Sequence, residues 1–356
     1  MMRALLLLLT LSLLAPATTA SAQQTLCPGD CAVDGAVQIG DLLLMVNVIN
    51  GTRDIADCRA GDADGDGRLR AHEVTRGVVS ALRGCSAGAV GQAAFYRALN
   101  GVPGTPAAIA AEEARALDQL QAAVAADEAD GWSWFLLGML HLQRLGREVD
   151  DYEHPSPFVV AEARLASAAL DRAAPLLAYD NRIPGFQGAA TFNLGVLTDD
   201  PVVRQRGLAQ LEASLATNFL FNSFSYLGAV APTVGRDDPL FARAIAYLDA
   251  GIQSGCTPAT DPRNCGNGGR APHNIQGSFT LFGDLYLKAG RSEDARRWYE
   301  FGLLIPGLEN WRHRALLEER LATFDDRAAR LADDDPSNDP RLAGVGPEAC
   351  VYCHYQ

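Results

Sequence analysis

Two short residue patterns alternate along the chain from Pro106 onward, and they constrain the fold more than any other feature. The first pattern has an aromatic residue or threonine, two variable positions, leucine or phenylalanine, and then glycine. It occurs at Gly138, Gly195, Gly228 and Gly283. The second has a small residue, a large one four positions later, and a small one three positions after that. Its large residues are Leu120, Leu170, Leu211, Leu248 and Tyr299. Stacked helix pairs need this alternation, because small residues let neighbouring helices approach closely. We therefore expect an all-α fold.

The repeated patterns resemble tetratricopeptide repeats, and the best copy runs from Phe279 through Gly283 to Pro306. The resemblance implies an α-solenoid over residues 107–330 that binds other proteins along its concave face. The step from Gly195 to Gly228 is close to one repeat. The two longer steps predict insertions at 148–156 and 254–274.

A group of aromatic residues on these expected helices has two interpretations. Its members are Trp134, Phe135, Phe219, Phe221, Phe224 and Tyr226. We expect them to form solenoid core, and the alternative is a ligand-binding box.

Residues 62–73 follow the pattern of a calcium-binding loop, with carboxylates at positions 1, 3 and 5, glycine at position 6 and an acid at position 12. The expected ligands are the side chains of Asp62, Asp64, Asp66 and Glu73 and the backbone carbonyl of Arg68. Calcium prefers six to eight oxygen ligands, and Glu73 can supply two of them. An apolar helical stretch, Val74–Leu82, follows directly.

The same frame occurs 32 residues upstream, so the segment is an internal duplication. Asp30, Asp34 and Asp41 correspond to Asp62, Asp66 and Glu73, and a helical stretch, Leu42–Ile49, follows. Ala32 at position 3 removes one ligand, which leaves open whether the first loop holds calcium.

The two loop-helix units resemble dockerin modules, which bind calcium and dock onto cohesin proteins. The flanking cysteines resemble those of disulfide-bearing dockerin-like variants from exported bacterial proteins. Loop positions 10 and 11, which carry cohesin choice in dockerins, are Ile39-Gly40 and Ala71-His72 instead of a Ser/Thr pair. The four cysteines of this segment allow three disulfide pairings, and the sequence does not choose among them.

The N-terminus predicts export. Arg3, an apolar stretch from Ala4 to Leu14 and the small residues Ala20-Ser21-Ala22 have the order of a signal peptide, which we assign to residues 1–22. No later stretch is long enough to span a membrane. We expect a periplasmic or extracellular protein in which cysteines can oxidise, including a Cys256–Cys265 disulfide.

Residues Cys350, Cys353 and His354 form the C-x-x-C-H pattern, which resembles the haem-attachment motif of c-type cytochromes. The resemblance implies haem c, with two thioether bonds and the imidazole as proximal iron ligand. The alternatives are a Cys350–Cys353 disulfide and a zinc half-site. The sequence does not choose a sixth ligand among Met139, His141, His154, His273, His313 and a residue of another copy of the protein.

These features predict five segments: a signal peptide, 1–22; a calcium module, 23–86; a linker, 87–106; a helical body, 107–330; and a tail, 331–356. Two functional hypotheses remain. One is an electron-transfer component or redox-assembly subunit that carries one haem; the other is a haem-free interaction scaffold. Self-assembly or a redox partner fits the first. A net charge of -13 argues against nucleic acid as a partner, and no hydrolase or kinase motif occurs.

Overall fold

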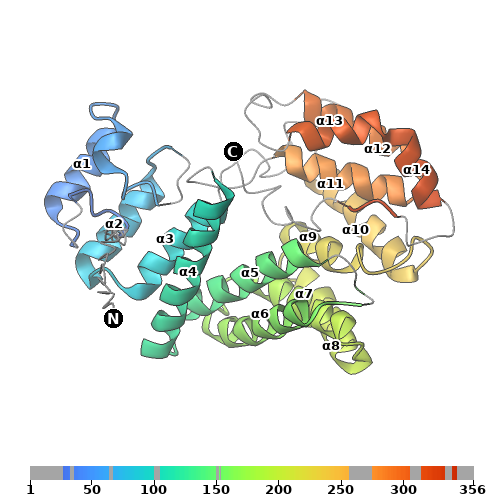
Figure 1. Cartoon of the computed structure of the whole chain (residues 1–356), viewed down its shortest axis with the longest axis horizontal. Helices are drawn as coiled ribbons and strands as arrows, with labels where there is room; N and C mark the ends of the chain where they lie inside the picture. Colours follow the sequence, from blue (N-terminus) through green and yellow to red (C-terminus); the bar gives the residue numbers. More distant parts are fainter. Residues whose placement is uncertain are drawn as a thin grey trace, which may run out of the picture.

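The computed structural model describes residues 27–32, 36–63, 67–99, 105–149, 152, 154–255, 275–304, 314–332 and 339–342. All regular structure in these ranges is helical, which confirms the predicted fold class. The N-terminal module has α1 (Ile39–Ile49), the short 3-10 helix η1 (Ile55–Cys58) and α2 (Ala71–Arg83). Both predicted apolar stretches of the module therefore lie on helices. Figure 1 shows the module at one end of the chain's arc of helices.

The rest of the described chain is a series of antiparallel helix pairs. The helices are α3 (Ala87–Leu99), α4 (Pro106–Ala126), α5 (Gly131–Glu148), α6 (Pro157–Leu176), α7 (Ile183–Leu197), α8 (Pro201–Leu215), α9 (Phe219–Val230), α10 (Pro239–Gly255), α11 (Ile275–Lys288), α12 (Ser292–Leu303), α13 (Arg314–Ala322) and α14 (Phe324–Ala332). Each odd-numbered helix from α3 packs on the helix that follows it, and α3 also contacts α5 as α7 contacts α9. The arrangement is solenoid-like (Figure 1).

Helix α3 lies inside the stretch predicted as a linker, and that part of the domain prediction needs correction. Val90, Phe95 and Leu99 are buried, and α3 packs against both α4 and α5. Gly91 makes the contact possible, because a methyl group there would lie 2.8 Å from Cγ of Leu120. The helical body therefore includes Ala87–Leu99.

In four of the five copies of the second pattern, all except that of Leu248, the large residue packs on a glycine of the preceding helix. Leu170 lies on Gly138, and Tyr299 lies on Gly283. Leu120 and Leu211 lie in the same way on Gly91 and Gly188, two glycines that the first pattern does not include. Small residues therefore let neighbouring helices approach closely, as expected. The sequence pattern identified only some of the glycines that make these contacts.

The long step between the first two patterned glycines comes mainly from helix length. Helices α5 and α6 have 18 and 20 residues, whereas α7 and α8 have 15 each. Only a short connection, residues 149–156, separates α5 from α6. The predicted insertion at 254–274 lies almost wholly outside the described residues.

The aromatic residues that we expected in the core are buried only in part. Tyr226 is fully buried, Phe135 and Phe221 are half-buried, and Phe224 is 41% exposed. Phe186 of α7 joins the group: its ring lies 5.5 Å from those of Phe135 and Phe221. These rings link α5, α7 and α9 along one side of the helix stack.

Candidate functional site

The second loop ends at Glu73, whose carboxylate holds the start of α2. Its two oxygens accept backbone N–H groups from both ends of the loop, from Ala63 at 2.8 Å and from Arg70 at 2.9 Å. Arg70 is the N-cap of α2, so Glu73 occupies the third helical position, where a carboxylate also favours the helix dipole. The side chain is buried.

The first loop repeats this arrangement with an aspartate. Asp41 accepts the backbone N–H groups of Ala32 at 3.0 Å and Gln38 at 2.8 Å, and it lies at the third position of α1. It is buried as well. The two halves of the sequence duplication therefore share the same local geometry: in each loop the carboxylate at position 12 accepts two backbone N–H groups.

Gly67 and Asp62 shape the second loop. Gly67 has a φ of 78°, a left-handed conformation that a side chain disfavours, and its N–H donates to Oδ2 of Asp62 at 2.9 Å. The position-1 carboxylate thus holds the turn at position 6, as the calcium-loop interpretation expects.

The structure describes some of the predicted calcium ligands and not others. Asp34, Asp64 and Asp66 lie outside the described residues. The described ligand residues are Asp30, Asp41, Asp62, Arg68 and Glu73. In the described part of the chain, no three His, Cys, Asp or Glu side chains gather closely enough to hold a metal. The coordination sphere therefore stays a prediction.

Two disulfides close the module, Cys27–Cys85 and Cys31–Cys58. They select one of the three pairings that the sequence allowed. Cys27–Cys85 joins the two ends of the module, and Cys31–Cys58 joins the first loop to η1. Both bonds restrict the conformations of the unfolded chain, which stabilises a small unit whose hydrophobic cluster centres on Met45, Cys58 and Leu69.

The two repeats also meet through their backbones. The Gly29 N–H donates to the carbonyl of Ala60 at 2.8 Å, and Gly29 lies so close to Gly77 of α2 that a methyl group on it would be 2.7 Å from the Gly77 Cα. Gly77 in turn faces Met45 of α1. Small residues at this crossing let the loop and both helices form one compact unit.

The two α-helices of the module carry exposed apolar side chains. Seven large hydrophobic side chains of α1 and α2 are exposed: Ile39, Leu43, Val46, Ile49, Val78, Val79 and Leu82. We call this set the module face. Loop positions 10 and 11 of both repeats, Ile39-Gly40 and Ala71-His72, are exposed at the helix starts. The sequence did not reveal the module face, because an apolar helical pattern looks the same whether it is buried or exposed.

The other predicted sites fall largely outside the described residues. These are the haem motif Cys350, Cys353 and His354, and the Cys256–Cys265 pair. Among the candidates for the sixth ligand of the haem iron, His141 is buried on α5, with Nδ1 2.6 Å from Oε2 of Glu162. None of the described helices has the length and apolar character of a membrane span.

The fold and the site define a helical repeat protein with a disulfide-closed, paired-loop module at its N-terminus. Residues 28–76 match the family model described as the Dockerin type I domain. This match covers both loops, all of α1 and the first part of α2, and none of the helical body. Comparison with curated proteins and with solved structures found no match.

Proposed function

We propose that this chain is an exported docking protein whose calcium-binding module attaches the helical body to a protein partner. The observation that carries the proposal is the module face, which concentrates exposed apolar side chains on two short helices. Large exposed apolar patches are rare on soluble proteins, and they usually mark a surface that binds another molecule. The dockerin match supports a calcium-binding, protein-docking module.

Calcium is the metal that the loop chemistry favours. All the proposed ligands are oxygens: Asp62, Asp64, Asp66, the Arg68 carbonyl and Glu73, and in the first loop Asp30, Asp34 and Asp41. Each oxygen of Glu73 accepts one backbone bond, and a carboxylate has about four acceptor positions. Glu73 can therefore bind calcium and keep both backbone bonds. The ion would offset the repulsion between the clustered carboxylates.

Calcium should promote partner capture by ordering the loops from which α1 and α2 begin. We expect the full chain to retain a partner from the exported proteins of its source when calcium is present, and to release it when a chelator is added. Asp62→Ala should lower both calcium uptake and capture, because it removes a ligand and the acceptor of the Gly67 N–H. Calorimetry measures the uptake.

Two matched variants locate the contact. Leu43→Glu places a charge in the module face, and Val202→Glu places one on an exposed apolar residue of α8. Only Leu43→Glu should abolish capture, while circular dichroism and calcium uptake stay unchanged for both. Capture that persists with Leu43→Glu, or in chelator, would contradict the proposal.

We place the module in residues 23–86 and the helical body from Ala87 to about residue 330, which is a revised form of the sequence-based division. The Cys27–Cys85 disulfide closes the module just before α3, which supports this boundary. The helical body would bind a second protein partner, or another copy of the chain, along its concave face. Export follows from the N-terminal signal-peptide pattern, and two disulfides in the module support an oxidising compartment.

A second candidate function is electron transfer through haem c, and the C-x-x-C-H motif favours it. Cys350 and Cys353 would form the thioether bonds, and His354 would bind the iron. When the protein is made in a host that attaches haem, its colour should survive acid-acetone extraction, and Cys350→Ala with Cys353→Ala should remove it. A colourless protein with the mass of the bare polypeptide would reject haem and leave the docking function intact.

A further inference from the structure

Helix α9 carries an exposed apolar stripe on the side of the helical body. Leu220 and Phe224 lie one turn apart, and they are 44% and 41% exposed. The Phe224 ring stacks on Phe282 of α11, with ring centroids 5.8 Å apart. A segment that covered these two side chains with apolar residues would remove their surface from water, which is favourable.

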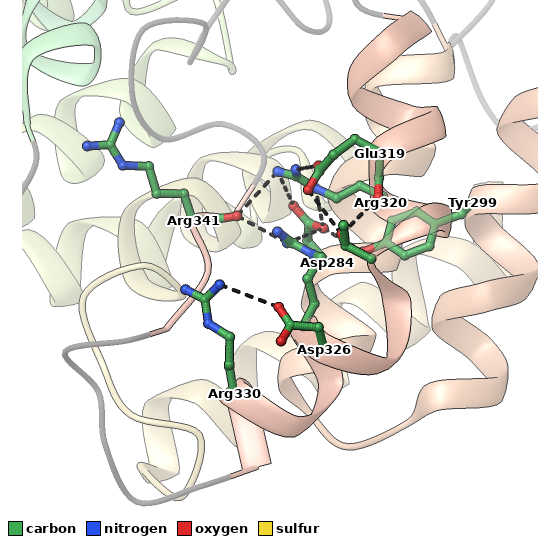
Figure 2. A network of polar contacts seen from close by, with 9 residues as sticks. Asp284, Tyr299, Glu319, Arg320, Asp326, Arg330 and Arg341 are labelled. Atoms are coloured by element: carbon green, nitrogen blue, oxygen red, sulfur yellow. Dashed lines mark hydrogen bonds and ion pairs between the residues drawn. The ribbon is translucent and has the colours of Figure 1, made fainter.

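A short C-terminal segment is fixed to the neighbouring helices, and Figure 2 shows its anchor. The backbone carbonyl of Arg341 accepts hydrogen bonds from Arg320 of α13 at 3.3 Å and from Arg327 of α14 at 3.2 Å. Pro340 and Leu342 on either side are buried, while the Arg341 side chain is exposed. The residues after Leu342 therefore leave from a fixed point.

That fixed point lies near the end of α9. The ammonium group of Lys288 donates to the carbonyls of Ala231 and Val234, which directly follow α9, at 2.9 and 2.7 Å. Arg236, two residues after Val234, donates to the carbonyl of Leu331 at 3.2 Å, so the chain that follows α9 also contacts the end of α14. Phe282 is six residues before Lys288 on α11, or about 9 Å along the helix.

The chain after Leu342 has the length and the composition to cover the stripe. Ten residues lead from Leu342 to Tyr352, which is about 33 Å when extended. Residues 343–356 include Val345, Val351 and two tyrosines, and Glu348 is their only charged side chain at neutral pH if His354 is neutral. The segment 256–274 also flanks α11, but it has no aromatic or large aliphatic residue.

We propose that the segment 343–356 of this chain docks on the apolar stripe formed by Leu220 and Phe224 of α9. The anchored segment 339–342 would hold the tail at one end, and apolar contacts would hold it at the other. The docking would position the Cys350–His354 motif beside α9 and α11 whatever its cysteines carry. The inference is independent of the calcium-dependent docking function.

A photo-crosslinker at the stripe identifies its occupant in the full chain. Phe224→p-benzoylphenylalanine, illuminated at low protein concentration, should join position 224 to a peptide within 343–356 of the same molecule. Leu220→p-benzoylphenylalanine should give the same peptide. The control at Leu176 of α6, which is 39% exposed, should give none. Mass spectrometry reads the joined peptides.

Every other crosslinking pattern overturns the proposal. Joining to 256–274, to 305–313 or to a second copy would name a different occupant, and no joined peptide would mean an open stripe. A second measurement avoids the bulky probe: Val351→Asp with Tyr352→Asp should speed hydrogen exchange across Phe219–Val230 several-fold. Glu348→Gln, which keeps the apolar residues, should leave that exchange unchanged. Equal exchange in both variants counts against docking.

Discussion

A single methyl group at Gly283 should destabilise the C-terminal helices by about 3 kcal/mol, the upper end of the usual cost of overpacking. The Cβ of Gly283→Ala would overlap the ring of Tyr299 on α12. Tyr299 cannot move aside, because it is fully buried and its hydroxyl donates to Oδ1 of Asp284 at 2.5 Å. Helices α11 and α12 would have to separate.

Gly228→Ala is the matched control, because Gly228 holds the same place in the repeated pattern on α9. Apart from its chain neighbours and the backbone of its own helix, no atom lies within 4 Å of a methyl group there. Alanine should therefore stabilise the helix by about 0.5 to 1 kcal/mol through its better helix propensity. Urea unfolding of both variants measures the difference. Equal effects of the two substitutions would mean that the glycine pattern does not report helix contact.

The contrast between these two glycines shows how far the sequence determined the fold. The alternation of patterns predicted the order of helices, because glycine and alanine at helical spacing require close neighbours. It did not predict which glycine is in contact, since that depends on the position of the partner helix. The sequence patterns also did not predict the helix at Ala87–Leu99, because the alanines and glycines of this stretch were interpreted as a linker. Its packing depends on the contact between Gly91 and Leu120 of α4, which the local sequence does not show.

At the candidate site, the sequence predicted the local geometry of the loops better than it predicted which side chains are exposed. The spacing of Asp41 and Glu73 predicted carboxylates at the two helix starts, because a loop and its first helical turn are set by neighbouring residues. The pairing of Cys27 with Cys85 spans 58 residues and is a property of the folded module. The exposure of Leu43 could not be read from its apolar character.

A buried charge cluster at the C-terminal end was not foreseen at all. Asp284 of α11 is fully buried and contacts two arginines, Arg320 at 3.1 Å and Arg327 at 3.1 Å, which lie 36 and 43 residues further along the chain. Such separations leave no periodic signal. Figure 2 shows how Tyr299, Arg320 and the Arg341 carbonyl converge around this carboxylate.

Asp284→Ala should cost about 3 to 5 kcal/mol, because it removes the buried counter-charge of Arg327 and leaves Arg320 with only the half-exposed Glu319. The exposure of both arginines is very low, at 6% and 4%, so water cannot replace the lost carboxylate. Tyr299→Phe removes only the hydroxyl donor and should cost about 1 kcal/mol. The loss should appear first in α11–α14, since each helix pair of a solenoid depends mainly on its neighbours.

The size of the Asp284→Ala effect separates an unpaired charge from a lost contact. Asp284→Leu combined with Arg320→Met and Arg327→Met removes all three charges and keeps most of the volume. This triple variant should recover most of the stability, because a buried ion cluster and an apolar cluster of similar size often differ little in free energy. Buried Trp298 on α12 gives a fluorescence signal for this region in urea. If Asp284→Ala cost under about 1 kcal/mol, or the triple variant were no better than Asp284→Ala, the charges would not control the stability of this end.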